Sequence, residues 1–129
     1  MAAKKVLNMA VIGISGRGFG LLTNLLEMDD VRIVGVAELY KDRLEKAADA
    51  VVKAGQKKPV ATLDYTKLLT MDELDAVIIP SSWENHSKIA LDCLHAGKYT
   101  ATEVGGATSV QQCWELVRAS EASKPFMLL

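Results

Sequence analysis

The sequence has little of several residue types that mark whole classes of protein. Its 129 residues include 2 cysteines and 3 prolines, and 5% are aromatic. Cys93 and Cys113 form neither a CxxC ligand pair nor a disulfide framework, and we expect no metal site. They suit a reducing cytosol, where a free cysteine behaves as a small apolar residue. Disorder and low complexity are excluded, because half of the residues are apolar and 24% are charged.

An excess of charge of either sign is also missing. Fifteen basic against sixteen acidic residues leave a net charge of −1, which favours neither a nucleic-acid surface nor a membrane patch. No apolar run approaches the roughly 18 residues of a membrane span. The run at residues 6–13 is shorter than a signal peptide needs and no small-residue cleavage site follows it. We therefore expect a cytoplasmic domain with no nucleic-acid or membrane partner.

Short apolar runs alternate with amphipathic stretches along the whole chain. Several of the apolar runs are near-continuous in Val, Ile and Leu, which is typical of strands buried on both faces. The expected strands are residues 6–12, 31–38, 59–62, 75–79, 98–104 and 125–129. Residues 63–72 are expected to add one short helical turn. Apolar stripes at helical spacing are formed by Leu21, Leu22, Leu25 and Leu26, by Leu44, Ala47, Ala48 and Val51, by Ile89, Ala90, Cys93 and Leu94, and by Val110, Cys113, Trp114 and Val117.

Helix boundaries carry their own signals. Gly55 and Gly97 fall where glycines end helices, and Thr108 or Ser109, with a glutamine three residues on, indicates a capping box. Strand–helix–strand alternation requires parallel strands joined by right-handed crossovers. We predict a single α/β domain over residues 1–129, with a doubly wound parallel six-stranded sheet of the Rossmann type. Because the last strand ends on an apolar residue, we also expect this chain to be part of a longer protein.

A glycine-rich turn joins the first expected strand to the first expected helix. Gly13 allows a tight turn and Gly18 allows close packing of helix on strand. Ser15 stands where the second glycine of a GxGxxG fingerprint would be, and its small size, with Gly16 beside it, still lets the backbone approach a pyrophosphate. The helix N-terminus favours such an anion. The alternative is a tight turn with no ligand.

The second expected strand ends in Glu38, which lies 20 residues after Gly18. That spacing matches the carboxylate that accepts hydrogen bonds from an adenosine ribose. Its charge would repel a 2′-phosphate, so Glu38 favours NAD over NADP. Arg43 could stack on adenine or soften that repulsion. The alternative is a solvated strand end.

Polar residues also follow the fourth and fifth strands, where ligands of open parallel sheets bind. From spacing alone, His86 is predicted to be a hydrogen-bonding residue at a helix terminus rather than a catalyst. Glu103 interrupts a strand that should be buried, which makes it a stronger candidate for a functional residue. We expect Trp114 and both cysteines to lie in the core. His95 is predicted to be a cation at a helix C-terminus.

The order of these features resembles the N-terminal domain of the Gfo/Idh/MocA oxidoreductase family. The matching features are the glycine loop, the acid ending strand two, residues 75–80 followed by His86, and residues 96–99 leading to Glu103. The resemblance covers essentially the whole chain. It implies an NAD-dependent dehydrogenase of a sugar or polyol. It also implies a C-terminal substrate domain absent from these residues, and a homo-oligomeric whole protein.

One departure from the family pattern points to a particular branch. Most of its dehydrogenases have Glu-Lys-Pro after strand five, whereas this chain has Glu103, Val104 and Gly105. Residues 102–108 and 113–117 are similar to the branch of NAD-dependent α-N-acetylgalactosaminidases, glycoside hydrolase family 109. In that branch the nicotinamide oxidises a sugar hydroxyl transiently, the glycosidic oxygen is eliminated, and the hydride returns.

The loop analysis and the resemblance together give a set of candidate cofactor contacts. They are Gly13, Ser15, Gly16, Arg17, Gly18, Glu38, Trp83, Glu84, Asn85, His86, Glu103 and Val104. No general base is assigned: His86 and Glu103 are the only candidates, and each is expected to position the cofactor.

Three functions remain open at the level of sequence. The leading one is the NAD-binding domain of a sugar or polyol oxidoreductase. The second is a redox-neutral, NAD-dependent glycosidase. The third is a non-catalytic nucleotide- or CoA-binding module, which would not need Glu38.

Overall fold

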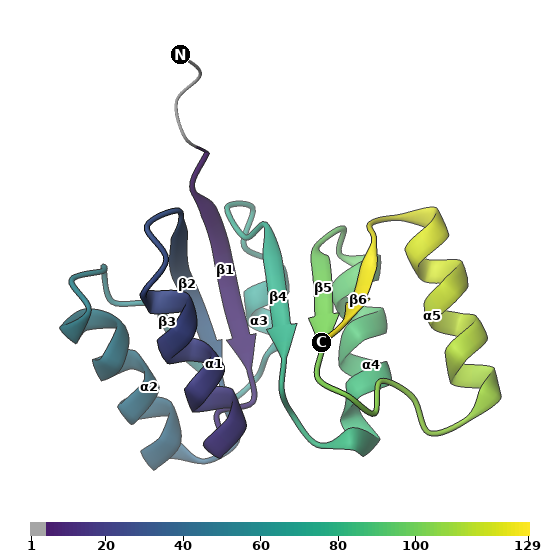
Figure 1. Cartoon of the computed structure of the whole chain (residues 1–129), viewed down its shortest axis with the longest axis horizontal. Helices are drawn as coiled ribbons and strands as arrows, with labels where there is room; N and C mark the ends of the chain where they lie inside the picture. The colour runs from purple at the N-terminus through teal and green to yellow at the C-terminus, as the bar shows by residue number, and fades with distance from the viewer. Residues whose placement is uncertain (1–4) are drawn as a thin grey trace.

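The computed structural model describes residues 5–129, in which strands and helices alternate along the chain (Figure 1). The strands are β1 (Leu7–Ile12), β2 (Val31–Ala37), β3 (Val60–Thr62), β4 (Ala76–Ile79), β5 (Tyr99–Thr102) and β6 (Phe126–Leu128). The helices are α1 (Gly16–Leu26), α2 (Lys41–Lys53), α3 (Thr66–Leu69), α4 (Trp83–His95) and α5 (Val110–Ala122). All strand pairs are parallel, in the order β3-β2-β1-β4-β5-β6. The predicted doubly wound six-stranded sheet is confirmed.

The two faces of the sheet have separate apolar cores. One core packs Leu22 of α1 and Leu44 of α2 against the sheet, and the other packs Leu68 of α3 and Leu94 of α4. Neighbouring residues of β1 alternate between the two cores, and every residue of β4 is buried. This is the burial that near-continuous apolar strands predict. Within residues 5–129, none of the helices is long and apolar enough to cross a membrane.

The expected helix boundaries are present. Gly55 and Gly97 follow the ends of α2 and α4 with φ of +85° and +74°, a conformation that other residues rarely adopt. Ser109 caps α5 by accepting a hydrogen bond from the backbone N–H of Gln112, whose side chain accepts one from Thr108. The short turn expected within residues 63–72 is α3.

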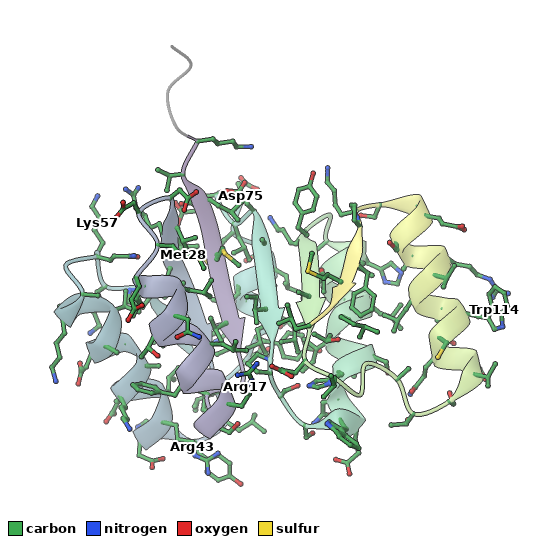
Figure 2. All side chains as sticks on the ribbon, viewed as in Figure 1. Arg17, Met28, Arg43, Lys57, Asp75 and Trp114 are labelled. Atoms are coloured by element: carbon green, nitrogen blue, oxygen red, sulfur yellow. The ribbon has the colours of Figure 1, made fainter. Side chains whose placement is uncertain are left out.

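The prediction that Trp114 and Cys113 lie in the core is wrong. Trp114 is 57% exposed and Cys113 is also exposed, and Figure 2 shows Trp114 projecting outward from α5. Leu116 and Ala119 are the residues that α5 buries, so its buried side is narrower than its apolar stripe. Between α5 and β6 an apolar groove of about 550 Å³ remains open. Cys93, by contrast, is fully buried as expected, and burial raises its pKa to about 12.

The fifth and sixth strands are shorter than expected and only partly covered. β5 ends at Thr102, so Glu103 lies in the loop that follows and does not interrupt a buried strand. Tyr99 and Met127 are 48% and 60% exposed because β5 and β6 lie toward the edge of the sheet, away from α1 and α2.

Candidate functional site: a dinucleotide cleft

The carboxyl ends of the strands meet along one edge of the sheet, at the bottom of Figure 1. β1 lies between β2 and β4, and the chain leaves β1 into α1 on one face and leaves β4 into α4 on the other. The strand order therefore reverses at β1 and β4. In open α/β sheets this switch point is where ligands bind. All the candidate residues belong to the loops and helix starts at this edge.

The glycine loop packs as tightly as its sequence predicts. Gly13 has φ of +103°, and a Cβ there would lie 2.8 Å from the Cα of Ser81. A Cβ on Gly18 would lie 2.0 Å from the carbonyl oxygen of Gly13. Any larger residue at position 13 or 18 would push α1 or the loop after β4 away from β1.

The first turn of α1 is open to solvent. Ser15 is the N-cap residue, and its side chain makes no capping hydrogen bond within the described residues. Ser15, Gly16 and Arg17 are all exposed. Uncapped backbone N–H groups and the positive end of the helix dipole suit a phosphate group at this position.

Glu38 joins the glycine loop to the end of β2. Its Oε2 accepts a hydrogen bond from the backbone N–H of Ile14 at 2.6 Å, and its Oε1 accepts from Leu39 and Tyr40 at 2.8 and 3.2 Å. A carboxylate offers about four acceptor positions. Three are used here, which leaves room for a ribose hydroxyl. Glu38 thus also orders the loop, a role that its spacing alone did not indicate.

An ion pair crosses between the two halves of this edge. Arg17 Nε, at the start of α1, donates to Glu103 Oε1, in the loop after β5, at 2.5 Å. Figure 2 shows Arg17 beside α1, near the carboxyl ends of the strands. The hydrogen bond from Arg17 is the main cause that holds the pKa of Glu103 below its usual range. The pair places a cation and an anion together at the switch point.

The start of α4 presents three exposed side chains and one buried one. Trp83, Glu84 and Asn85 are exposed, and the Asn85 side chain donates to Ser82 Oγ at 2.8 Å. His86 is fully buried. It is a hydrogen-bonding residue in the first turn of a helix, as its spacing predicts. Its side chain offers no surface to a ligand in this structure, so any part in cofactor binding would be indirect.

Ser81 was not among the sequence candidates, although its position two residues after the end of a buried strand was an available signal. Its backbone lies against Gly13, and its buried hydroxyl has no hydrogen-bond partner within residues 5–129. A buried hydroxyl without a partner is rare in proteins and suits a further polar group at this edge. With the open α1 turn, the close glycine packing and the Glu38 acceptor, the residues present fit a dinucleotide.

Comparison with known proteins agrees with this geometry. The family model GFO_IDH_MocA, described as "Oxidoreductase family, NAD-binding Rossmann fold", matches residues 7–128. The chain belongs to the Gfo/Idh/MocA oxidoreductase family. This Gfo/Idh/MocA chain is thus an NAD-binding Rossmann domain, as the glycine loop, Glu38 and the sheet order predict.

The similar curated proteins are named as glycosidases. The chain is 33% identical over 127 residues to "Glycosyl hydrolase family 109 protein 2" of Akkermansia muciniphila, covering 95% of this chain and 27% of that protein. It is 28% identical over 124 residues to "Alpha-N-acetylgalactosaminidase" of Shewanella oneidensis, with 93% and 27% covered. This Gfo/Idh/MocA domain therefore spans about a quarter of the length of the curated relatives it matches.

Similar solved structures include dehydrogenases. The scyllo-inositol dehydrogenase of Lactobacillus casei matches with a TM-score of 0.85 at 19% identity, over 97% of this chain and 36% of that one. A probable dehydrogenase of Thermotoga maritima matches with a TM-score of 0.83 at 23% identity, over 94% and 35%. At these identities the likeness shows the fold.

Proposed function

We propose that this domain holds NAD for an enzyme that transfers hydride between the nicotinamide and a carbinol of a sugar or polyol. The observation that carries the proposal is the switch-point edge. There the open turn of α1, the Glu38 carboxylate and the loops after β4 and β5 lie side by side in a family of NAD-binding domains. Bound nicotinamide supplies hydride acceptance and donation, and the protein supplies orientation and electrostatics.

Each part of the cleft has a separate role in the proposal. The first turn of α1, from Ser15 to Gly18, and the Arg17 guanidinium hold the pyrophosphate, while Glu38 accepts from the adenosine ribose. Arg17 is paired with Glu103 in the structure. When the dinucleotide binds, the Arg17 guanidinium would leave Glu103 for the pyrophosphate or contact both. The start of α4 and residues 103–104 border the nicotinamide half.

The proposal extends to the whole protein. The curated relatives are longer than this chain, and we propose that a C-terminal domain supplies the substrate site and the catalytic acid and base. Such a protein would form a homo-oligomer through that domain. We place it in the cytosol, in keeping with the free thiols of Cys93 and Cys113.

A second candidate is supported by specific observations. The similar curated proteins are named as family 109 glycosyl hydrolases, and Val104 occupies the place of the lysine in the family's Glu-Lys-Pro pattern. Both fit a redox-neutral glycosidase, in which the hydride returns to the sugar after the glycosidic bond is cleaved. Such an enzyme would keep its NAD and release no NADH.

Calorimetric titration of the 129-residue chain with NAD, NADP and CoA tests the binding role. We expect saturable NAD binding that is clearly tighter than NADP binding, since Glu38 repels a 2′-phosphate. CoA binding equal to or tighter than NAD binding would instead support the non-catalytic module. No NAD binding either by this chain or by the whole protein would overturn the proposal.

Product analysis of the whole protein separates the two chemistries. The protein is incubated with NAD and a panel of free sugars and polyols, and separately with aryl α-N-acetylgalactosaminides. Accumulation of NADH with a free sugar or polyol supports the dehydrogenase. Cleavage of the glycoside with no net NADH supports the glycosidase.

A further inference from the structure

Half of the large apolar side chains that the structure exposes lie in residues 99–129, about the last quarter of the chain. They belong to α5, β5, β6 and the residues that follow the two strands. These elements form the end of the sheet farthest from α2 (Figure 1). Single apolar residues are normal on a protein surface, whereas a gathered set marks an interaction site.

The helix α5 is apolar on two sides. Leu116 and Ala119 belong to the core. Val110, Trp114 and Val117 are exposed, and their spacing of four and three residues places them together on another side of the helix. A surface helix normally turns polar residues to the solvent, and a helix that is apolar on several sides is normally covered on all of them. The exposed side of α5 therefore has the composition of a contact surface.

A groove of about 550 Å³ runs beside this exposed side, between α5 and β6. Cys113 and Val117 of α5 line it, together with Phe126 and Leu128 of β6. Within residues 5–129, β6 pairs only with β5, so no further strand closes the groove. Val117 belongs both to the groove and to the exposed side, which makes the two continuous. The α5 surface is the name used below for this groove together with Val110, Trp114 and Val117.

Glu121 is the charged residue that lines the groove. No Lys or Arg in the described part of the chain forms an ion pair with it. A purely apolar element that covered the groove would remove the Glu121 carboxylate from water without a partner, at a large cost in free energy. The element that fits this groove is therefore apolar and carries a Lys or Arg that meets Glu121.

The curated relatives are long enough to supply such an element from the same polypeptide. The match covers 27% of the Akkermansia muciniphila protein and 27% of the Shewanella oneidensis protein, so nearly three quarters of each lies outside the matched stretch. A further domain on the same polypeptide is present beside every copy at a high effective concentration, which a separate partner is not. The length of the relatives thus favours an occupant from the whole protein.

We propose that the α5 surface is the contact through which the C-terminal domain packs on this domain, with an apolar segment in the groove and a Lys or Arg of that segment against Glu121. The proposal rests on the C-terminal domain proposed above. Gly106 and Ala107 also line the groove, in the loop that begins at Glu103. The packed domain therefore holds the loop that borders the nicotinamide half of the cleft.

The thiol of Cys113 reports whether the α5 surface is covered. Cys113 is exposed and Cys93 is fully buried, so Cys93 is an internal control. The 129-residue chain and the whole protein are labelled with N-ethylmaleimide, and peptide mass spectrometry gives the rate at each thiol. We expect Cys113 to react about tenfold or more slowly in the whole protein than in the chain. Equal rates would overturn the proposal. Protection of Cys113 that grows with protein concentration would assign the surface to a second copy, and would also overturn it.

A matched pair of substitutions tests the apolar part of the contact. Trp114→Ser removes an exposed apolar residue of α5, and Val52→Ser removes one of α2. In the whole protein we expect Trp114→Ser to speed the labelling of Cys113 by about fivefold or more, toward the rate in the 129-residue chain, because a central aromatic contact is lost. Val52→Ser should leave that rate unchanged. A similar labelling rate in the two variants would contradict the proposal.

Charge reversal tests the polar part of the contact. Glu121→Lys places a cation opposite the expected Lys or Arg, so it should speed the labelling of Cys113 in the whole protein by about fivefold or more. The same substitution should not change the rate in the 129-residue chain. Glu45→Lys, at an exposed position of α2, is the matched control. If Glu121→Lys behaves like Glu45→Lys, no cation meets Glu121 and the proposed segment is wrong.

None of these measurements uses NAD, which separates this proposal from the proposed function. If neither the chain nor the whole protein binds NAD, the proposed function fails, while the labelling rates still decide whether the α5 surface is covered. If NAD binds and Cys113 reacts equally fast in the chain and the whole protein, the NAD-binding role stands and the docking role of the α5 surface is refuted.

Discussion

At the scale of single residues, the two carboxylates of the cleft have different partners. Glu38 accepts only from backbone N–H groups, whereas Glu103 is paired with the guanidinium of Arg17. Backbone partners are fixed by the fold and do not titrate. A guanidinium on a side chain that is 64% exposed can be exchanged for a phosphate group. Glu38 therefore acts as a fixed acceptor, and the pair of Arg17 and Glu103 as a replaceable one.

The Glu103 pair gives a pH prediction. Arg17→Gln should raise the pKa of Glu103 toward its ordinary value, because the hydrogen bond from Arg17 is the largest cause of its lowering. A lowered pKa in the folded state stabilises the protein above the ordinary glutamate pKa, and the effect is lost as pH falls through the folded value. The measurements are a carbon-13 NMR titration of the carboxyl group and unfolding at several pH values. An unchanged Glu103 titration would contradict the assigned cause.

A second prediction concerns Glu38. Glu38→Gln puts an amide NH₂ where a backbone N–H now donates, so NAD binding should weaken by roughly tenfold or more. The preference for NAD over NADP should narrow, since the repelling charge is gone. Calorimetric Kd values for both cofactors check this, with Glu45→Gln, an exposed site on α2, as control. An unchanged ratio of the two Kd values would remove the role assigned to Glu38.

At the scale of elements, α1 holds one glycine that tertiary packing requires and one that it does not. Gly18 packs against the Gly13 carbonyl, while a Cβ on Gly20 would meet nothing within 4 Å. The two glycines lie in the same helix and differ only in what surrounds them. Position 18 is limited by tertiary packing, and position 20 only by helix propensity.

These glycines give a matched pair of variants. Gly18→Ala should destabilise the fold by roughly 1–3 kcal/mol, because α1 must move from β1 to relieve the clash. Gly20→Ala should stabilise it by about 0.5–1 kcal/mol, the helix preference of alanine. Urea denaturation followed by circular dichroism measures both. Equal effects of the two substitutions would refute the close packing.

The exposed stripe of α5 gives a further test. Trp114→Ser should change the free energy of unfolding by no more than about 0.5 kcal/mol, as substitutions on exposed surface do. Leu116→Ala on the buried side of the same helix should cost about 2–5 kcal/mol. Comparable losses from both would mean that Trp114 belongs to the core. The same denaturation experiment compares them.

At the scale of the whole molecule, the cleft is assembled from segments far apart in the sequence. The loops after β1, β2, β4 and β5 meet because all six strands are parallel, so their carboxyl ends lie at one edge. A ligand that contacts several of these loops stabilises the folded state as a whole.

Thermal unfolding measures this stabilisation. At NAD concentrations near 100 times Kd, folding should gain about 2.7 kcal/mol, or roughly 10 °C in Tm for a chain of this size. Gly20→Ala should retain the shift, and Gly18→Ala should lose most of it. A Tm that does not respond to NAD at concentrations that saturate in calorimetry would contradict binding to the folded domain.

The sequence by itself determined the architecture and the family of this protein. Alternating apolar strands and amphipathic helices specify a parallel sheet, because each property is local and periodic. The glycine loop and the spacing to Glu38 likewise predict a dinucleotide site, because the tight turn and the distance to the end of the next strand are both set within one βαβ unit.

Only the tertiary structure decided which side chains face the cleft. The burial of His86 between two carbonyls, the pairing of Arg17 with Glu103 and the exposure of Trp114 depend on residues distant in the chain. A stripe of apolar residues indicates that a helix has an apolar side. How much of that side is buried depends on the elements that pack against the helix. For the same reason, the spacing that predicts a ribose acceptor at Glu38 could not show that its carboxylate accepts a hydrogen bond from the backbone of Ile14.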